Sequence, residues 1–415
     1  MLKQVQHDEV GGRRPTLLTY ENGLLLLLGV TFGVVFIDRN ALTTLMPFIQ
    51  KEFGLSNTQV GLLAACLSIT WGLSGYAIGA ISDRAGRRKP FLIAAVLLFS
   101  LTAMVSGFAQ GFLSLLVARL AMGLAEGPVF PLSQSLLATT SSEHRRGLNA
   151  GLMQATITSL IGLIAAPVLL VTVADSHGWR AAFYVASVPG LLMALLMARF
   201  IREPKVARPL AAEGHGGMPQ MALLRVRNVM LCLGIAICEV SWMVIAWAFL
   251  PLYFTQIRHF APETMGYLIG ALGVSSAIFG LALPALSDRI GRKPVVVFFS
   301  AVALIIPLGV AFGPPDPLMA GILLLIGWSA SGIFPIFMAT IPAESVPASS
   351  LGAAIGLVGG LAEVLGGFFG PPAAGLLADR FGLDAPLVLM GVLAVISTIL
   401  ALGLIETHPR RRAAP

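Results

Sequence analysis

Charged residues are scarce in this sequence. Only 11% of the 415 residues are Asp, Glu, Lys or Arg, whereas soluble globular proteins contain about 25%. The hydrophobic share is 56% and the mean hydropathy is +0.86. This composition excludes an ordinary soluble domain and predicts a polytopic membrane protein.

Cysteine and histidine are also few, and none stands where catalysis or metal binding would need it. Cys66, Cys232 and Cys238 fall in apolar segments without disulfide or metal-ligand spacing, so we interpret them as packing residues. All six histidines fall in polar connections or tails, so none is placed as an intramembrane proton relay. We therefore expect no enzyme, no metal and no other cofactor. The net charge of +7 resides in loops and does not indicate nucleic-acid binding.

Long apolar runs fill most of the chain. Each of twelve runs holds at least about 20 residues, which is enough for a helix to cross the roughly 30 Å hydrocarbon core. Lipid cannot satisfy the backbone of open strands, so the runs are predicted to be helices. Their approximate ranges are 19–47, 58–82, 90–109, 112–138, 147–174, 180–201, 228–256, 263–287, 294–312, 317–341, 351–378 and 384–406.

Lysine and arginine define an orientation. Of the 27, 21 fall on one side of the predicted helices, four on the other and two within them. The positive-inside rule then places both termini in the cytoplasm. The polar N-terminus predicts no cleavable signal peptide, and we expect a bacterial inner-membrane protein that functions as a monomer.

The chain repeats itself after about half its length. GAISDRAGRRKP at 79–90 recurs as LPALSDRIGRKP at 283–294. Two pseudo-symmetric six-helix bundles in an all-α membrane protein are therefore predicted. The predicted parts are a tail (1–18), an N-terminal bundle (19–201), a cytoplasmic linker (202–227), a C-terminal bundle (228–406) and a second tail (407–415).

The repeated loops resemble the signature of the major facilitator superfamily, G-x-x-x-D-R-x-G-R-R after the second helix. The resemblance extends to helix number, duplication and linker position, and it implies that superfamily's fold. A charged loop of this kind can hold the two halves together in one conformation and release them in another; the simpler alternative is a loop that is merely positive inside. The predicted gating residues are Asp83, Arg84, Arg87, Asp288, Arg289 and Arg292.

Two charged pairs interrupt apolar segments of the N-terminal half. Arg119 and Glu126 lie seven residues apart, so a helix places them on nearly the same face. Asp38 and Arg39 stand in the first segment. Charges inside a bilayer cost at least a few kcal/mol, so they usually face a partner or a water-filled cavity. The bland alternative is two structural ion pairs.

This pattern resembles the anion:cation symporter branch of the superfamily, which includes sugar-acid, phthalate-type and sialic acid carriers. The resemblance implies that Arg39 holds a substrate carboxylate, that Asp38 and Glu126 carry coupled protons, and that Arg119 sets the charge state of Glu126. Physical chemistry agrees, because burial favours a neutral carboxyl, a nearby arginine favours the charged one, and the arginine fork suits a carboxylate.

The C-terminal half lacks these charges and has two other acids. Glu363 is predicted as a further proton site, with a cationic substrate group or a structural partner as alternatives, and Glu239 is expected near the cytoplasmic end, snorkelling or lining the inner vestibule. Each cavity candidate also has a packing interpretation. With Arg39, the predicted substrate-binding residues are Asn40, Trp71, Gln134, Gln154 and Trp242.

The leading hypothesis is proton-coupled uptake of a small organic anion, such as a monocarboxylate, aromatic acid or sugar acid, by alternating access. Few amides and many aromatics favour a smaller or more apolar carboxylate over a sugar acid. A proton-antiporting exporter of drugs or lipophilic cations stays open, although the Gly-Pro-x-x-Gly-Gly run usual in such exporters is missing from segment five. A solute sensor without net transport is a remote alternative.

Overall fold

The computed structural model describes residues 19–142, 145–203 and 218–408, and all its regular elements are helices. Twelve helices in these ranges are long and apolar enough to span a membrane. The prediction of an all-α protein with twelve membrane-spanning helices is therefore confirmed.

Six of these spans form the N-terminal half. The first three are single helices, the fourth and fifth are interrupted, and the sixth is α8. Their bounds are α1 (Tyr20–Phe53), α2 (Asn57–Ala85), α3 (Lys89–Ser106), α4 (Phe112–Glu126) with α5 (Val129–Thr140), α6 (Arg146–Gly151) with η2 (Leu152–Ile157), η3 (Ser159–Ala165) and α7 (Ala166–His177), and α8 (Trp179–Phe200).

The other six spans form the C-terminal half after a short helix, α9 (Gln220–Leu223). They are α10 (Arg227–Leu252) with η4 (Tyr253–Ile257), α11 (Pro262–Ile290), α12 (Arg292–Val302) with α13 (Ile305–Phe312), α14 (Pro317–Gly327) with η5 (Trp328–Ile333), η6 (Ile336–Thr340) and α15 (Ile341–Glu344), then η7 (Ala348–Ser350) leading into α16 (Leu351–Ala362) with η8 (Glu363–Phe368) and α17 (Gly370–Phe381), and α18 (Asp384–Leu402).

Both repeated loops turn at a glycine that has a positive φ angle. Gly86, after α2, has φ +62°, and Gly291, after α11, has φ +104°. A side chain would strain the backbone at such angles, so both copies of the motif need glycine there. The repeat therefore keeps a glycine at both turns, although three residues separate α2 from α3 and only Gly291 separates α11 from α12.

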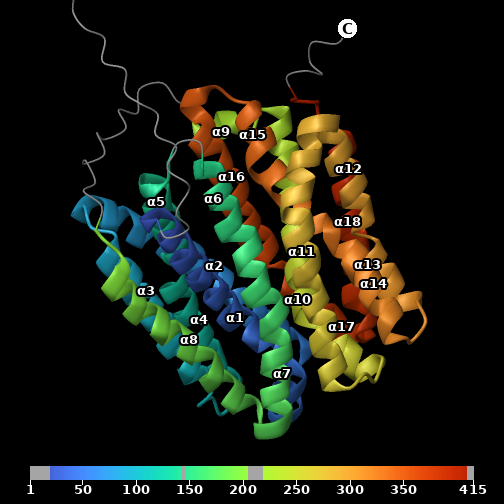
Figure 1. Ribbon diagram of the computed structural model, residues 1–415. Coiled ribbons are helices and arrows are strands. Elements are labelled where there is room, and N and C mark those ends of the chain that lie inside the picture. Colours follow the sequence, from blue (N-terminus) through green and yellow to red (C-terminus); the bar gives the residue numbers. More distant parts are fainter. Residues whose placement is uncertain (1–18, 143–144, 204–217, 409–415) are drawn as a thin grey trace, which may run out of the picture.

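The two halves lie side by side, with the blue-to-green half on the left of Figure 1 and the yellow-to-red half on the right. Following the predicted orientation, we call the end with the α1–α2 connection the outer end, and the end with the α2–α3 connection the inner end. In Figure 1, α9 and α15 lie at the inner end and the tip of α7 at the outer end.

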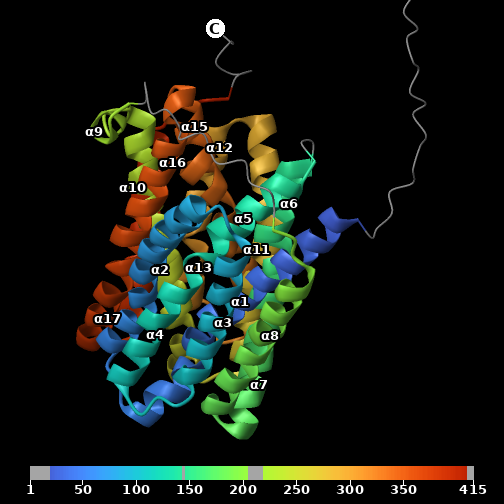
Figure 2. The same ribbon diagram turned by 90° about the vertical axis from the view of Figure 1, so that its left-hand side faces the viewer.

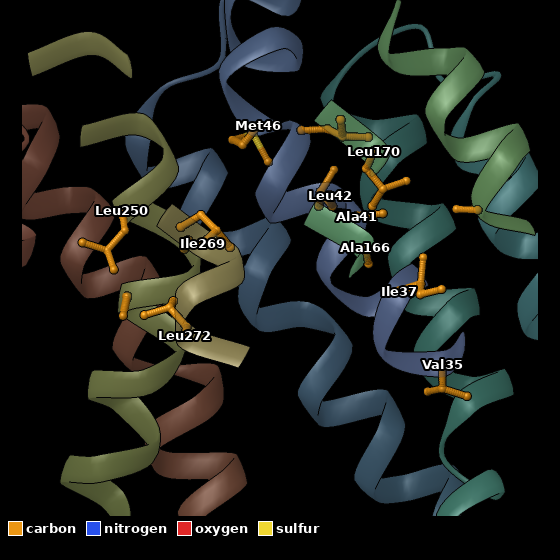
Figure 3. Packing of buried hydrophobic residues seen from close by; sticks show 14 of the residues in the cluster. Val35, Ile37, Ala41, Leu42, Met46, Ala166, Leu170, Leu250, Ile269 and Leu272 are labelled. Carbon is orange, nitrogen blue, oxygen red and sulfur yellow. The ribbon is translucent and has the colours of Figure 1, made fainter. Parts of the chain in front are cut away.

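One apolar core runs across both halves. Figure 3 shows Leu42 of α1 near Leu170 of α7, and Ile269 and Leu272 of α11 belong to the same cluster. Many large apolar side chains are instead exposed, including Leu195 at 66% and Phe312 at 84%. Exposed apolar surface on this scale is unusual for a soluble monomer and fits a surface covered by lipid.

Candidate functional site

Arg39 lies where the two halves meet. A cavity of about 30 Å³ beside it is lined from α1, α2, α4 and α10 by Arg39, Asn40, Leu42, Thr43, Leu63, Ala64, Leu67, Ser68, Arg119, Val244 and Trp247. This volume holds one or two water molecules, whereas small-molecule pockets measure about 300 Å³ or more. The site is therefore nearly closed in this conformation.

Aromatic rings border the Arg39 guanidinium. Its Cζ lies 5.6 Å from the centre of the Trp71 ring and 6.0 Å from that of Phe36. Among the described residues, no carboxylate is in salt-bridge contact with Arg39. Its fork thus stays available for the carboxylate of a ligand, which arginine binds through two parallel hydrogen bonds.

Asp38, Arg119 and Glu126 are buried together next to this cavity, with exposed fractions of 0%, 1% and 0%. Arg119 Nη1 donates to the backbone carbonyls of Asp38 and Arg39, each at 3.4 Å. All four carboxylate oxygens of Asp38 and Glu126 lack a hydrogen-bond partner. Within the described part of the chain, Asp38, Arg119 and Glu126 thus form no direct ion pair with one another, which speaks against the purely structural interpretation.

Electrostatics links the three groups to Arg39. Asp38 experiences the charges of Glu126 and Arg119, and Glu126 experiences those of Arg39 and Arg119. Two carboxylates without direct cationic partners are costly to keep ionised in a dry interior. The arrangement is therefore suited to binding protons.

Glycines let α4 carry its charges close to α2. A Cβ atom at Gly123 would lie 2.7 Å from the Leu67 carbonyl oxygen, and one at Gly127 would lie 2.2 Å from that of Trp71. Any larger residue would push the helices apart. The glycines between and beside Arg119 and Glu126 in the sequence thus position both charges.

Glu363, at the start of η8, reaches the site from the C-terminal half. The space beside Gly367 is bordered by Glu363 Oε2 and by the hydroxyl of Ser68, which lines the cavity. The charge that acts on Glu363 is that of Arg39, and Glu363 Oε2 has no hydrogen-bond partner. Both halves thus contribute a carboxyl group to the surroundings of Arg39.

Glu239 does not lie where we expected it. The prediction that it snorkels or lines an inner vestibule is wrong, because the side chain is only 1% exposed. Ser397 of α18 donates a 2.6 Å hydrogen bond to it and lies 3.2 Å from Ser300 of α12. Polar partners on two neighbouring helices hold Glu239 inside the C-terminal bundle.

The remaining predicted binding residues are distributed unevenly. Asn40 lines the cavity, and its amide donates to the Phe36 carbonyl at 3.0 Å. Trp242 is buried against Trp328, with ring centres 5.2 Å apart. Gln134 is half-buried on α5, Gln154 is exposed on η2, and neither borders the cavity. Missed by the sequence analysis were Ser68 and Thr43, small hydroxyl residues without a distinctive sequence signal.

The gating prediction concerns the inner-end loops. Arg292 pairs there with Asp288, and at 3.0 Å with Glu344, all three in the C-terminal half. Arg84, Arg87 and Arg289 are exposed, and the side chain of Asp83 lies outside the described part of the structure. In this conformation, the described ion pairs of these loops lie within the C-terminal half and do not connect the two halves.

The outer end is closed by contacts between the halves. Asp379, at the end of α17, accepts hydrogen bonds from the backbone N–H groups of Asn57 (2.7 Å) and Thr58 (2.9 Å), which begin α2. Gln256 donates to Gln50 at 2.8 Å across the same end. The sequence held an unused signal here, since Asp379 begins a further Asp-Arg-x-Gly pattern.

On the inner side of the cavity, the space is open. A groove of about 470 Å³ begins at Trp71 and follows α2 to Ala80, with Phe130 and Pro131 on its other wall. Cβ atoms at Gly352 and Gly356 of α16 would meet nothing within 4 Å. The groove thus lies on the inner side of Trp71, which borders the Arg39 guanidinium, while contacts between the halves close the outer end.

Comparison with known proteins gives the family. The model described as "Major Facilitator Superfamily" matches residues 28–359 and 229–415. The hexuronate transporter of Bacillus subtilis is 27% identical, with 91% of this chain and 92% of the relative covered. The cis,cis-muconate transport protein of Acinetobacter baylyi is 29% identical, with coverages of 83% and 84%.

Solved structures show the same fold. A bacterial homologue of the human lysosomal transporter Spinster, in an inward-facing and unoccupied conformation, superposes with a TM-score of 0.77 at 18% identity, covering 97% of this chain and 100% of that one. The family model spans both halves of the chain, and the helical architecture agrees with it. The chain therefore belongs to the Major Facilitator Superfamily and is a membrane transporter.

Proposed function

We propose that the protein is a proton-coupled symporter that takes up a small organic anion by alternating access. The observation that supports this most is the position of Arg39, a cation without carboxylate contact among the described residues, in a cavity between the halves. Beside it lie the buried and unpartnered carboxyl groups of Asp38 and Glu126.

The charges give each residue a role. The substrate carboxylate binds the Arg39 guanidinium and neutralises its positive charge, which otherwise stabilises the ionised form of Glu126. Without that positive charge, the repulsion between the carboxylates of Glu126 and Asp38 favours their protonation. Arg119 anchors the pair through the backbone of α1. Release of substrate and protons at the inner end returns the empty carrier.

Aromatic rings set the class of anion. Phe36 and Trp71 flank the guanidinium, and Trp247 borders the same cavity. Flat aromatic walls with few amides favour a compact or unsaturated carboxylate over a polyhydroxylated sugar acid. The two relatives named above are transporters of organic anions, hexuronate and cis,cis-muconate.

The test uses purified protein in sealed liposomes that contain a pH-sensitive dye. Monocarboxylates, aromatic acids and sugar acids are added outside without an imposed proton gradient. We expect the interior to acidify with at least one acid, and this signal to disappear in Arg39→Ala and in the double variant Glu126→Gln, Glu363→Gln. Arg380→Ala, which removes an exposed arginine from the outer end, is the matched control and keeps the signal.

Two results would contradict the proposal. Acidification that persists in Arg39→Ala removes the carboxylate clamp. If no acid changes the internal pH and lipophilic cations do, the protein is instead a proton-antiporting exporter of such cations.

A further inference from the structure

A groove on the membrane-facing surface lies between α1 and α8, which cross in Figure 2. It measures about 520 Å³, and most of its wall is apolar. Leu26 (59% exposed), Leu196 (41%) and Phe200 (57%) present large apolar side chains along it. The groove is thus wide and apolar enough for a hydrocarbon chain.

Two arginines stand at one end of the groove, Arg199 and Arg202. The Arg202 guanidinium lies 5.1 Å from the centre of the Tyr20 ring, and the Arg202 backbone N–H donates to the Tyr20 hydroxyl at 2.9 Å. The Arg199 guanidinium lies 5.6 Å from the centre of the Phe200 ring. Ring contacts of this kind restrict where the guanidinium groups point.

Neither arginine is neutralised within the described residues, since no carboxylate there is in salt-bridge contact with either one. The nearest acid in sequence, Glu203, accepts hydrogen bonds instead from the backbone N–H groups of Arg88 (2.6 Å) and Lys89 (3.1 Å). The Lys89 ammonium adds positive charge at the same end, because it donates to the Ala198 carbonyl at 2.8 Å. The end of the groove is therefore positive.

We propose that this groove binds an anionic phospholipid of the inner leaflet. Its phosphate lies at Arg199 and Arg202, and one acyl chain follows the apolar walls of α1 and α8. Basic residues at a membrane surface attract anionic lipids, and basic pockets between transmembrane helices on the cytoplasmic side bind their headgroups. The predicted orientation places the arginines in the headgroup region of that leaflet.

The acyl-chain path can be blocked without touching a charge. Gly23 lines the groove, and a Cβ atom there would meet nothing within 4 Å. Leucine therefore fits at this position and fills the groove, and it is also a better helix former than glycine. Gly23→Leu thus separates occupation of the groove from attraction by the arginines.

The experiment counts lipids retained by the full-length protein in native mass spectrometry. Phosphatidylglycerol and phosphatidylcholine with the same acyl chains are compared. For phosphatidylglycerol, we expect the double variant Arg199→Gln, Arg202→Gln to bind about thirtyfold more weakly, which corresponds to about 1 kcal/mol for each arginine. Gly23→Leu should weaken retention of the same lipid.

The matched control neutralises two exposed basic residues at the outer end, Lys51→Gln and Arg380→Gln, and should leave retention unchanged. The proposal is overturned when phosphatidylcholine is retained as strongly as phosphatidylglycerol. It is also overturned when the outer-end control loses as much lipid as the arginine variant, or when Gly23→Leu loses none.

Discussion

The charges around the site predict how many protons accompany each substrate. Two arginines, Arg39 and Arg119, face three carboxyl groups, Asp38, Glu126 and Glu363. We call these five residues the central charge set. With every member ionised, the set carries one net negative charge.

An occluded site with one uncompensated charge costs about 3 kcal/mol, so it is populated about 100-fold less than a neutral one. Under the proposed mechanism, we therefore expect the empty carrier to change conformation with one proton bound, and the carrier with a singly charged anion to do so with two. Each singly charged substrate should then bring one proton and a doubly charged one two, so that uptake should be electroneutral. The protons belong to the coupled set rather than to one residue.

Removing carboxyl groups tests this count. Glu363→Gln leaves two arginines against two acids, so the ratio stays at one proton for each singly charged anion. Glu363→Gln combined with Glu126→Gln leaves one acid, and an anion alone then neutralises the loaded carrier. The double variant should carry the anion without a proton, and its empty form should return with one positive charge.

Proteoliposomes with a potassium gradient and valinomycin set the membrane potential, while substrate uptake and internal pH are measured together. The native protein should show a one-to-one ratio and no response to potential. Uptake by the double variant should be accelerated by an inside-positive potential, by up to about fiftyfold for 100 mV. Glu263→Gln, at an acid in the first turn of α11 near the outer end, is the control. Potential-dependent uptake by the native protein, or a double variant that still moves protons one-to-one, would refute the charge count.

Three further changes test single contacts. Arg39→Lys should weaken substrate binding about tenfold and Arg39→Ala at least 100-fold, measured by calorimetry, because lysine lacks the bidentate fork; equal effects would exclude bidentate recognition. Gly375→Val should speed hydrogen exchange at the start of α2, because its Cβ would lie 2.2 Å from the Asn57 carbonyl oxygen, whereas Gly352→Val, in open space, should not. Glu406→Gln should lower stability at pH 7 by about 1 kcal/mol, since burial raises the pKa of Glu406 less than four backbone N–H groups lower it; this stabilisation is present above about pH 4.3, the usual pKa, and is lost as pH falls, so melting curves of the two proteins should converge in acid.

Most of the fold could be predicted because lipid leaves few choices. A run of about 20 apolar residues must form a helix to satisfy its backbone, so counting runs gave all twelve spans. The duplication was visible in the sequence because both turns require a residue with a positive φ angle, so that glycine stands at the same place in both motifs, as Gly86 and Gly291. The breaks within spans were not predicted. The π-helical turn η8, for example, begins at Glu363 and has no periodic signal.

The N-terminal part of the site could also be located from the sequence, since charges such as Asp38 and Arg119 stand out in apolar segments. Depth within the bundle could not be predicted. Glu239 stands in a similar apolar run, yet serines on two other helices, Ser300 and Ser397, provide its surroundings. Such contacts depend on which faces of distant helices pack together, and the sequence of one helix does not predict that packing.

Glu239 and Glu363, two buried acids of the C-terminal half, differ in whether residues of the other half surround them. Glu239 has hydroxyl partners inside one half, so movement of the halves leaves its surroundings unchanged. Glu363 experiences Arg39 of the opposite half and lies beside Ser68 of α2, so its surroundings change whenever the halves rotate. A proton site can couple to transport only when its surroundings differ between conformations. In the C-terminal half, Glu363 meets this condition and Glu239 does not.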